Sequence, residues 1–117
     1  MSHTLPSIKN RKDFLKISNQ GLSSPQCGLV LQTSINNENN GVRIGITATK
    51  KIGNAVIRNR CKRKLKNLAN EVLHNYAQKN NDYVLIARNS TYDRGMSLLK
   101  KDLIKALKEV NKYKKNN

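Results

Sequence analysis

Residues 50–66 read Lys-Lys-Ile-Gly-Asn-Ala-Val-Ile-Arg-Asn-Arg-Cys-Lys-Arg-Lys-Leu-Lys, and eight of these seventeen side chains are cationic while none is acidic. The acid-free stretch is wider still, because no Asp or Glu occurs from residue 39 to residue 70. Asn54 is a suitable N-cap, so a helix is predicted to begin beside Gly53. Lys and Arg are unfavourable near the positive end of a helix. A bound phosphate reverses this, since the free backbone N–H groups and the cations then share one anion.

The predicted helix extends over residues 55–78 and is expected to pack by one side only. At about 100° per residue, its apolar side chains fall within about a third of the circumference. These apolar residues are Ile57, Cys61, Leu65, Leu68, Val72 and Tyr76. The remaining arc carries Arg60, Lys62, Arg63 and Lys66. The helix is therefore expected to present positive charge on the side that faces away from the core.

On either side of this helix, apolar runs alternate with turns. Before it, the pattern predicts a helix over residues 11–19 capped by Asn10, a turn at residues 23–25, and strands over residues 27–33 and 42–49. After it come a strand over residues 83–87, continuously apolar and so expected to be covered on both sides, and a final amphipathic helix over residues 96–110. The first two strands are expected to form an antiparallel hairpin.

The element order is thus helix, strand, strand, helix, strand, helix, which is typical of the α+β class. The long helix joins two strands, and such a crossover is right-handed by default. A length of 117 residues predicts a single domain over residues 1–117, with its core at about residues 8–110. Residues 1–9 are expected to form a loose arm, and residues 112–117 a flexible basic tail.

The net charge of +16 predicts a polyanionic partner. Nucleic acid is favoured, an acidic membrane surface less so, and an acidic protein least. Asp and Glu are dispersed, without a pair spaced for acid–base or metal chemistry. Cys27 and Cys61 form no CxxC motif or Cys/His cluster. We therefore expect no metal site and no catalytic residue in the protein. No signal peptide or transmembrane stretch is apparent, so a soluble cytoplasmic protein is expected.

Several candidate residues have two interpretations. The cations of residues 50–66 could be a solvated surface, but a solvated surface normally mixes both signs of charge, so nucleic-acid contact is favoured. Phe14 is either a core residue or a platform on which an unpaired base stacks. Arg88 is either an ordinary charge at a strand end or a phosphate contact. The strand side that carries Thr47 and Thr49 is either exposed to solvent or the floor of a groove.

The sequence from Lys50 to Arg63 resembles the signature of the bacterial ribonuclease P protein component, which has the form K-K-x-G-N-A-V-x-R-N-R-x-K-R. Similar matches occur at residues 11–14, 43–45 and 82–88, so the resemblance spans residues 8–110. It implies a two-layer α-β sandwich with a mixed, mainly antiparallel four-stranded sheet, in the order αββ(β)αβα. It also implies that the crossover through the basic helix is left-handed.

The resemblance implies that the protein is the small subunit of a ribonucleoprotein endonuclease that removes 5′ leaders from precursor tRNA. A large RNA subunit would do the chemistry with Mg²⁺, and neither a membrane nor a protein partner is required. The expected RNA-binding residues are Lys50, Lys51, Asn54, Arg58, Asn59, Arg60, Lys62, Arg63, Lys64 and Lys66.

The resemblance also implies a cleft between the first helix and the sheet that holds the single-stranded leader. Its expected residues are Phe14, Ile17, Arg43, Thr47, Thr49 and Arg88. The family often has a second aromatic residue four positions after Phe14, where this chain has Ser18. The alternative function is a structural RNA-binding protein of the ribosomal type, without a role in cleavage.

Overall fold

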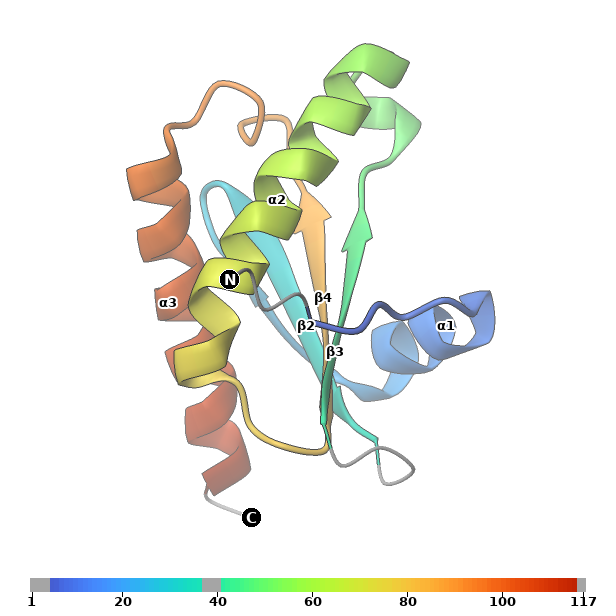
Figure 1. The fold of residues 1–117 in the computed structure, drawn as a ribbon, viewed down its shortest axis with the longest axis vertical. Helices are drawn as coiled ribbons and strands as arrows, with labels where there is room; N and C mark the ends of the chain where they lie inside the picture. Colours follow the sequence, from blue (N-terminus) through green and yellow to red (C-terminus); the bar gives the residue numbers. More distant parts are fainter. Residues whose placement is uncertain (1–4, 37–40, 116–117) are drawn as a thin grey trace.

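The computed structural model describes residues 5–36 and 41–115, and its elements follow the predicted α+β order with one additional strand. The elements are α1 (Arg11–Gln20), β1 (Leu22–Pro25), β2 (Leu29–Ile35), β3 (Val42–Thr47), the 3-10 turn η1 (Lys50–Ile52), α2 (Ala55–Tyr76), β4 (Asn81–Ala87) and α3 (Met96–Lys115). Figure 1 shows α2 and α3 side by side over one face of the sheet, with α1 set apart from them.

The four strands form one mixed sheet in the order β1-β2-β4-β3. β1 pairs with β2 and β2 with β4 in antiparallel fashion, whereas β3 and β4 are parallel. The predicted hairpin between residues 27–33 and 42–49 is therefore wrong, because β4 lies between these strands. β4 lies between β2 and β3, with α2 and α3 packed over one of its faces and α1 over the other, which suits its continuously apolar sequence.

The additional strand, β1, replaces the turn that was predicted at residues 23–25. Its register places Ser24 opposite Leu31 and Pro25 opposite Val30. Ser and Pro are unusual in strands, and Pro is tolerated only where a ladder hydrogen bond is not needed, as in an edge strand. β1 is such an edge strand, so the turn-like composition was compatible with pairing.

The crossover β3–α2–β4 is left-handed. In Figure 1 both strands point upward, α2 lies in front of the sheet, and β4 lies to the left of β3. The handedness implied by the family resemblance is confirmed, and the right-handed default is wrong for this chain.

α2 and α3 bury their apolar sides against one face of the sheet. The predicted stripe of α2 is confirmed at Cys61, Leu65, Leu68 and Val72, which are buried, while Ile57 and Tyr76 are half-buried at its ends. They pack with buried residues of α3 and of the strands, which include Leu99, Leu103, Leu107, Leu29, Leu31, Tyr83 and Leu85. These residues form the main aliphatic core.

The opposite face of the sheet carries a smaller cluster beneath α1. Ile8, Ile17 and Val84 are buried there, with Phe14 and Ile86 packed against them. α1 therefore adds a partial third layer to the expected two-layer sandwich. β4 contributes to both clusters, so its predicted coverage on both sides is confirmed.

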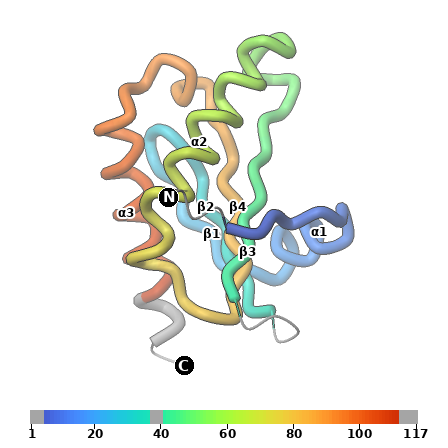
Figure 2. The backbone as a smooth tube through the Cα atoms, viewed as in Figure 1, coloured from blue at the N-terminus to red at the C-terminus, as the bar shows by residue number. Residues whose placement is uncertain are grey.

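The chain before α1 is tied to the sheet at residues 5–8, contrary to the loose arm that was expected. Ser7 forms a parallel bridge with Ile44 at the free edge of β3, and the Leu5 amide donates to Asn70 Oδ1 at 2.9 Å. Figure 2 shows this segment passing β3 on its way to α1. Residues 1–4 lie outside the described residues.

Two predictions about helix ends are also corrected. Asn10 occupies the N-cap position of α1 but makes no side-chain cap hydrogen bond. At the other end of the chain, α3 continues to Lys115, so the expected tail over residues 112–117 is helical as far as it is described. Residues 116 and 117 lie outside the described residues.

Candidate functional site

The turn that begins α2 is built by Gly53 and Asn54. Gly53 has a φ of 148°, a left-handed conformation that favours glycine. The Asn54 side chain accepts from the Ile57 amide at 3.0 Å, which confirms the predicted N-cap. The amides of Ala55 and Val56 have no acceptor among the described residues. The first turn contains no acidic side chain, so the positive helix end is not neutralised locally.

Most of the predicted RNA-binding cations are exposed around this helix end. We call this surface the α2 cationic face, and define it by Lys50, Lys51, Arg60, Lys62, Arg63 and Lys66. The four ion pairs of the described residues use Arg43, Arg94 and Lys100, and none uses a member of this face. Asn54 and Asn59 are exposed beside it. The face therefore has free donors for an external anion.

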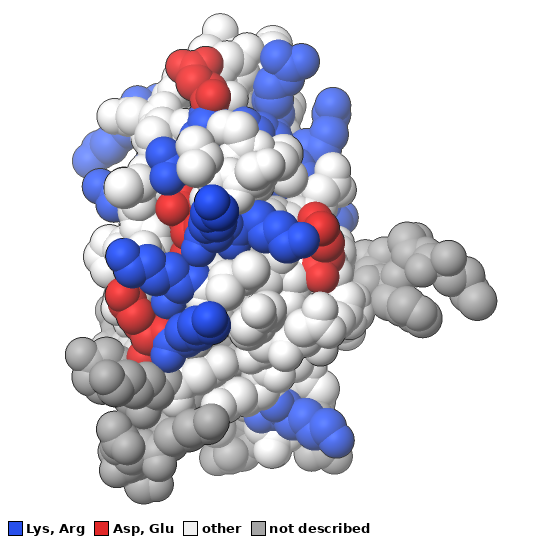
Figure 3. Space-filling view, turned by 90° about the vertical axis from the view of Figure 1, so that its left-hand side faces the viewer, with Lys and Arg blue, Asp and Glu red and all other residues white. Residues whose placement is uncertain are grey.

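The charge on α3 is arranged differently. Figure 3 views the molecule from the α3 side, where Asp and Glu lie among the Lys and Arg side chains. Lys100 of α3, for example, pairs with Glu71 of α2 at 3.0 Å. The exclusion of acids is thus a property of the α2 cationic face and not of the whole surface.

Arg58 differs from its neighbours in being half-buried. Its Nε atom is buried and has no hydrogen-bond partner among the described residues. No ion pair of the described residues involves Arg58 or Arg60, so neither guanidinium is tied to a carboxylate.

Lys64 does not join the α2 cationic face, although it was expected among the RNA-binding residues. Its ammonium donates to the carbonyl oxygens of Thr91, Tyr92 and Arg94, at 2.8, 3.0 and 2.8 Å. An ammonium has three donors, and all three are used here. Lys64 therefore holds the loop between β4 and α3, and it has no donor left for phosphate.

A groove of about 480 Å³ lies between α1 and the sheet, where a cleft was expected. Phe14 of α1 and Thr47 of β3 line it, as expected. The further lining residues, which the sequence reasoning missed, are Lys9, Arg11, Leu15, Ser18, Gln32, Val84 and Ile86. Alternate residues of a strand point to the same face, so Val84 and Ile86 are expected to share one. Only the sheet order shows that this is the face beneath α1.

Phe14 is both a core residue and part of the groove wall, the two roles that the sequence left open. Its ring packs against the small cluster beneath α1 and also lines the groove. A Cβ atom built on Gly45 would lie 2.5 Å from a ring carbon of Phe14, so the ring needs a residue without a side chain beneath it. The Thr47 side of β3 is correspondingly the floor of a groove.

The other expected cleft residues lie elsewhere. Ile17 is buried on the side of α1 that faces the sheet, with 2% of its surface exposed. Arg43 forms a paired hydrogen bond with Asp82, at 2.9 and 2.7 Å, and it also contacts Asp13. The hydrogen bond to Asp82 raises the pKa of Arg43. Arg43 thus stabilises the junction of α1 with the sheet, and its guanidinium faces a separate polar cavity of about 330 Å³.

Thr49 and Arg88 do not line the groove either. Thr49 is the N-cap residue of η1, and the Arg88 guanidinium donates to the Gln26 carbonyl oxygen at 2.9 Å. Both cysteines are free thiols: Cys27 is exposed, and burial raises the pKa of Cys61. Within residues 5–36 and 41–115, no three His, Cys, Asp or Glu side chains are grouped as metal ligands, and no helix has the length and apolar character of a membrane span.

An α+β fold with an acid-free cationic helix end and a groove that combines an aromatic ring with cations defines a protein of the RNA-binding class. The chain matches the family model for ribonuclease P over residues 4–111. It therefore belongs to the ribonuclease P protein family. Curated relatives named ribonuclease P protein component include one from Paramagnetospirillum magneticum, 36% identical, covering 98% of this chain and 90% of the relative. Another, from Erythrobacter litoralis, is 40% identical over 92% of this chain and 87% of the relative.

Solved structures that resemble this chain are also ribonuclease P proteins. The ribonuclease P protein of Staphylococcus aureus superposes with a TM-score of 0.74 at 32% identity, covering 87% of this chain and 92% of that one. The protein from Thermotoga maritima has a TM-score of 0.76 at 25% identity, covering 89% and 96%. The chain is thus an RNA-binding subunit of ribonuclease P, the enzyme that processes the 5′ end of tRNA, with an RNA subunit as its partner. The ribosomal alternative is not favoured.

Proposed function

We propose that the α2 cationic face binds the RNA subunit and that the groove beneath α1 binds the single-stranded 5′ leader of precursor tRNA. The observation that carries the proposal is the position of these two surfaces. α2 covers one face of the sheet, whereas the groove is formed by α1 with residues of the other face, among them Val84 and Ile86. One small protein can therefore contact two RNA segments at once.

The α2 cationic face suits a folded RNA because its cations are exposed and form no ion pair with the described residues. The arginine forks can each make two parallel hydrogen bonds to a phosphate, and the lysines act as point charges. The free amides of Ala55 and Val56 add donors at the positive end of the helix. Phosphates of the RNA would relieve the repulsion among these cations.

The groove suits an unpaired strand. Phe14 offers a ring on which a base can stack, and base–aromatic stacking does not depend strongly on the base. Lys9 and Arg11 lie at the same groove and are exposed, so they can contact the backbone phosphates. With Ser18 in place of a second aromatic, stacking rests on a single ring.

In this proposal the RNA subunit holds the Mg²⁺ ions that support cleavage, and no residue of the protein takes part in the chemical step. The protein holds the substrate near the RNA and screens the repulsion between two phosphate backbones. We place this activity in the cytoplasm, because the thiols of Cys27 and Cys61 are free, which is typical of a reducing compartment.

The test is cleavage of precursor tRNA by the reconstituted RNA and protein subunits at low Mg²⁺. We expect release of the 5′ leader to depend on the protein. We also expect precursor tRNA to bind more tightly than tRNA without a leader, and Phe14→Ala to reduce this difference by about 5- to 150-fold, the range for one stacked base.

Leu98→Ala is the matched control, because Leu98 is 46% exposed on α3 and lies outside the groove. The leader assignment is contradicted if Phe14→Ala and Leu98→Ala bind both substrates equally well. Leader release that does not depend on the protein at low Mg²⁺ would contradict the assisting role.

A further inference from the structure

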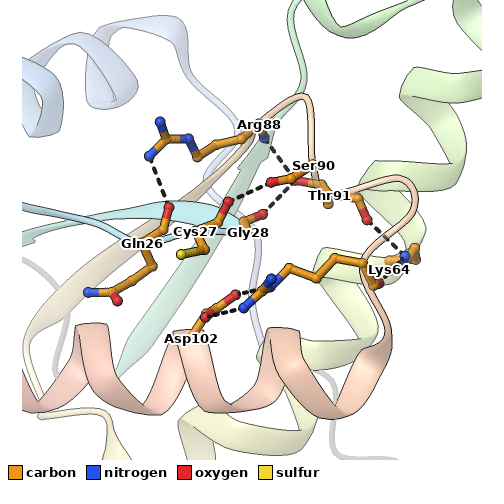
Figure 4. A network of polar contacts seen from close by, with 9 residues as sticks. Gln26, Cys27, Gly28, Lys64, Arg88, Ser90, Thr91 and Asp102 are labelled. Carbon is orange, nitrogen blue, oxygen red and sulfur yellow. Dashed lines mark hydrogen bonds and ion pairs between the residues drawn. The ribbon is translucent and has the colours of Figure 1, made fainter.

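The loop between β4 and α3 is held in place by hydrogen bonds to two other segments, α2 and the turn before β2. Lys64 of α2 donates to three of its carbonyl oxygens, as described above. The Thr91 hydroxyl donates to the Gly28 carbonyl oxygen at 2.6 Å, and the Ser90 hydroxyl donates to the Cys27 carbonyl oxygen at 2.5 Å. Figure 4 shows these contacts converging on the loop from the turn before β2 and from α2.

This clamped loop places Tyr92 beside the α2 cationic face. The Arg60 guanidinium carbon lies 5.7 Å from the centroid of the Tyr92 ring, and one Arg60 nitrogen donates to the Tyr92 hydroxyl at 3.3 Å. Tyr92 is half-buried and packs against the main core, so the ring is supported from behind. The aromatic ring is thus fixed in position before any ligand arrives.

A cavity of about 400 Å³ opens between this loop and α2, and Tyr92 forms part of its wall. Its lining combines cations, an amide, the aromatic ring and an exposed thioether, contributed by Arg60, Arg63, Lys64, Asn67, Tyr92 and Met96. The side chains of Arg63 and Asn67 make no hydrogen bond or ion pair with the described residues. The cavity is lined without an acidic side chain.

We propose that this cavity is a binding site for a single unpaired nucleotide of the RNA subunit, with its base against Tyr92 and Met96 and its phosphate at Arg60 and Arg63. The proposal rests on the assignment of the α2 cationic face to the RNA subunit and adds a subsite to it. Lys64 is a positioning residue, since it acts only through the loop that carries Tyr92.

The lining distinguishes an unpaired nucleotide from a phosphate backbone alone. Phosphate contact needs only cations, which the rest of the α2 cationic face already supplies. A fixed aromatic ring and an exposed Met side chain are apolar surfaces that suit a base plane, and a base in a duplex does not expose its plane. Asn67 offers both a donor and an acceptor for the edge of such a base.

The experiment measures binding of the full-length protein to the transcribed RNA subunit at several salt concentrations. Tyr92→Leu keeps an apolar side chain on the core but removes the ring, and we expect binding about 5- to 150-fold weaker. The slope of log Kd against log salt should not change, because stacking releases no counterions. Tyr92→Phe keeps the ring and should retain most of the affinity. Leu98→Ala, an exposed apolar residue outside the cavity, is the control and should bind as the wild type does.

A second variant and a second readout guard against a folding defect in Tyr92→Leu. Met96 is 40% exposed, so Met96→Ser should leave the melting temperature unchanged and still weaken binding. Chemical probing of the RNA should show one unpaired nucleotide that wild type and Tyr92→Phe protect and Tyr92→Leu does not.

The proposal is overturned if Tyr92→Leu and Met96→Ser bind as Leu98→Ala does, or if their loss of affinity comes with a lower salt slope and no change at a single nucleotide. Arg63→Ala shows whether only the nucleotide site is wrong or whether the α2 cationic face does not bind the RNA at all. If the α2 cationic face binds the RNA but the cavity holds no base, Arg63→Ala alone weakens binding and lowers the slope. If the face itself does not bind the RNA, Arg63→Ala also behaves as the wild type.

Discussion

Gly45 is the residue on which the position of the groove ring depends. A Cβ atom added at Gly45 would lie 2.5 and 2.7 Å from two carbons of the Phe14 ring. Any side chain at this position must therefore displace the ring or separate α1 from the sheet. The aromatic surface of the groove is thus set by a residue that contributes no side chain to it.

We predict that Gly45→Ala destabilises the protein by about 1–3 kcal/mol, the usual cost of overpacking a well-packed site. Urea denaturation measures this, and leader binding should weaken in the same variant. Gly95→Ala is the control for an added methyl group, because a Cβ atom there meets nothing within 4 Å, and its cost should be the smaller of the two. Equal stability of the two variants would show that Phe14 is not confined by Gly45.

The cations of residues 50–66 differ in how much of their environment helical periodicity determines. Exposure of Arg60, Lys62, Arg63 and Lys66 was predicted from the angular position of these residues around the helix. The three carbonyl oxygens that occupy Lys64 belong to residues 91–94, some thirty positions later in the chain. Only the tertiary fold brings them together, so helical periodicity could not have separated Lys64 from its neighbours.

At the scale of elements, α2 has two roles that are divided between its two sides. Its apolar side covers the sheet, and its polar side provides both the α2 cationic face and, through Lys64, the anchor of the loop between β4 and α3. The loop in turn begins α3, since the Leu99 amide donates to the Gly95 carbonyl oxygen at 3.0 Å. One lysine therefore connects the RNA-binding helix to the final helix.

We predict that Lys64→Met destabilises the protein by about 1.5–3 kcal/mol, because it removes charged hydrogen bonds and leaves half-buried carbonyl oxygens without partners. Lys62→Met on the same helix is the control: Lys62 is exposed, and its effect should remain within about 0.5 kcal/mol. Urea denaturation compares the two variants. Similar stabilities would mean that the three hydrogen bonds of Lys64 contribute nothing to the fold.

Strand order was the least predictable part of the fold. β2, β3 and β4 were each recognised from their apolar patterns, but the pairing of β2 with β3 was wrong because local pattern carries no information about which strand lies between. β1 was missed because Ser and Pro resemble a turn. The groove residues Gln32 and Val84 were also not predicted, because only the pairing of β2 with β4 places them opposite each other.

At the scale of the whole molecule, the net charge of +16 opposes compaction by repulsion among the cations. An anion that binds the folded state relieves this repulsion and stabilises the protein by mass action. The repulsion should be strongest on the α2 cationic face, because none of the ion pairs among the described residues uses a member of it. The folded state and the RNA-bound state are therefore expected to favour each other.

We predict that sulfate raises the melting temperature more than chloride does at equal ionic strength, with a stabilisation of about 2.7 kcal/mol when sulfate is at 100 times its Kd. Sulfate also strengthens apolar burial in any protein. The control is therefore the triple variant Lys62→Ala, Arg63→Ala and Lys66→Ala, in which the additional shift should be smaller. An equal shift in the wild type and the triple variant would remove the link between the face and stability.

The most direct test of the central claim, that the α2 cationic face binds the phosphates of the RNA subunit, is the salt dependence of that binding. For Lys62→Ala, Arg63→Ala and Lys66→Ala measured singly, the slope of log Kd against log salt should fall by about 0.7–0.9 for each phosphate that the variant no longer neutralises. Lys105→Ala, an exposed cation of α3, is the matched control and should keep the wild-type slope. Wild-type slopes in all three α2 variants, or an equal decrease in Lys105→Ala, would contradict the account.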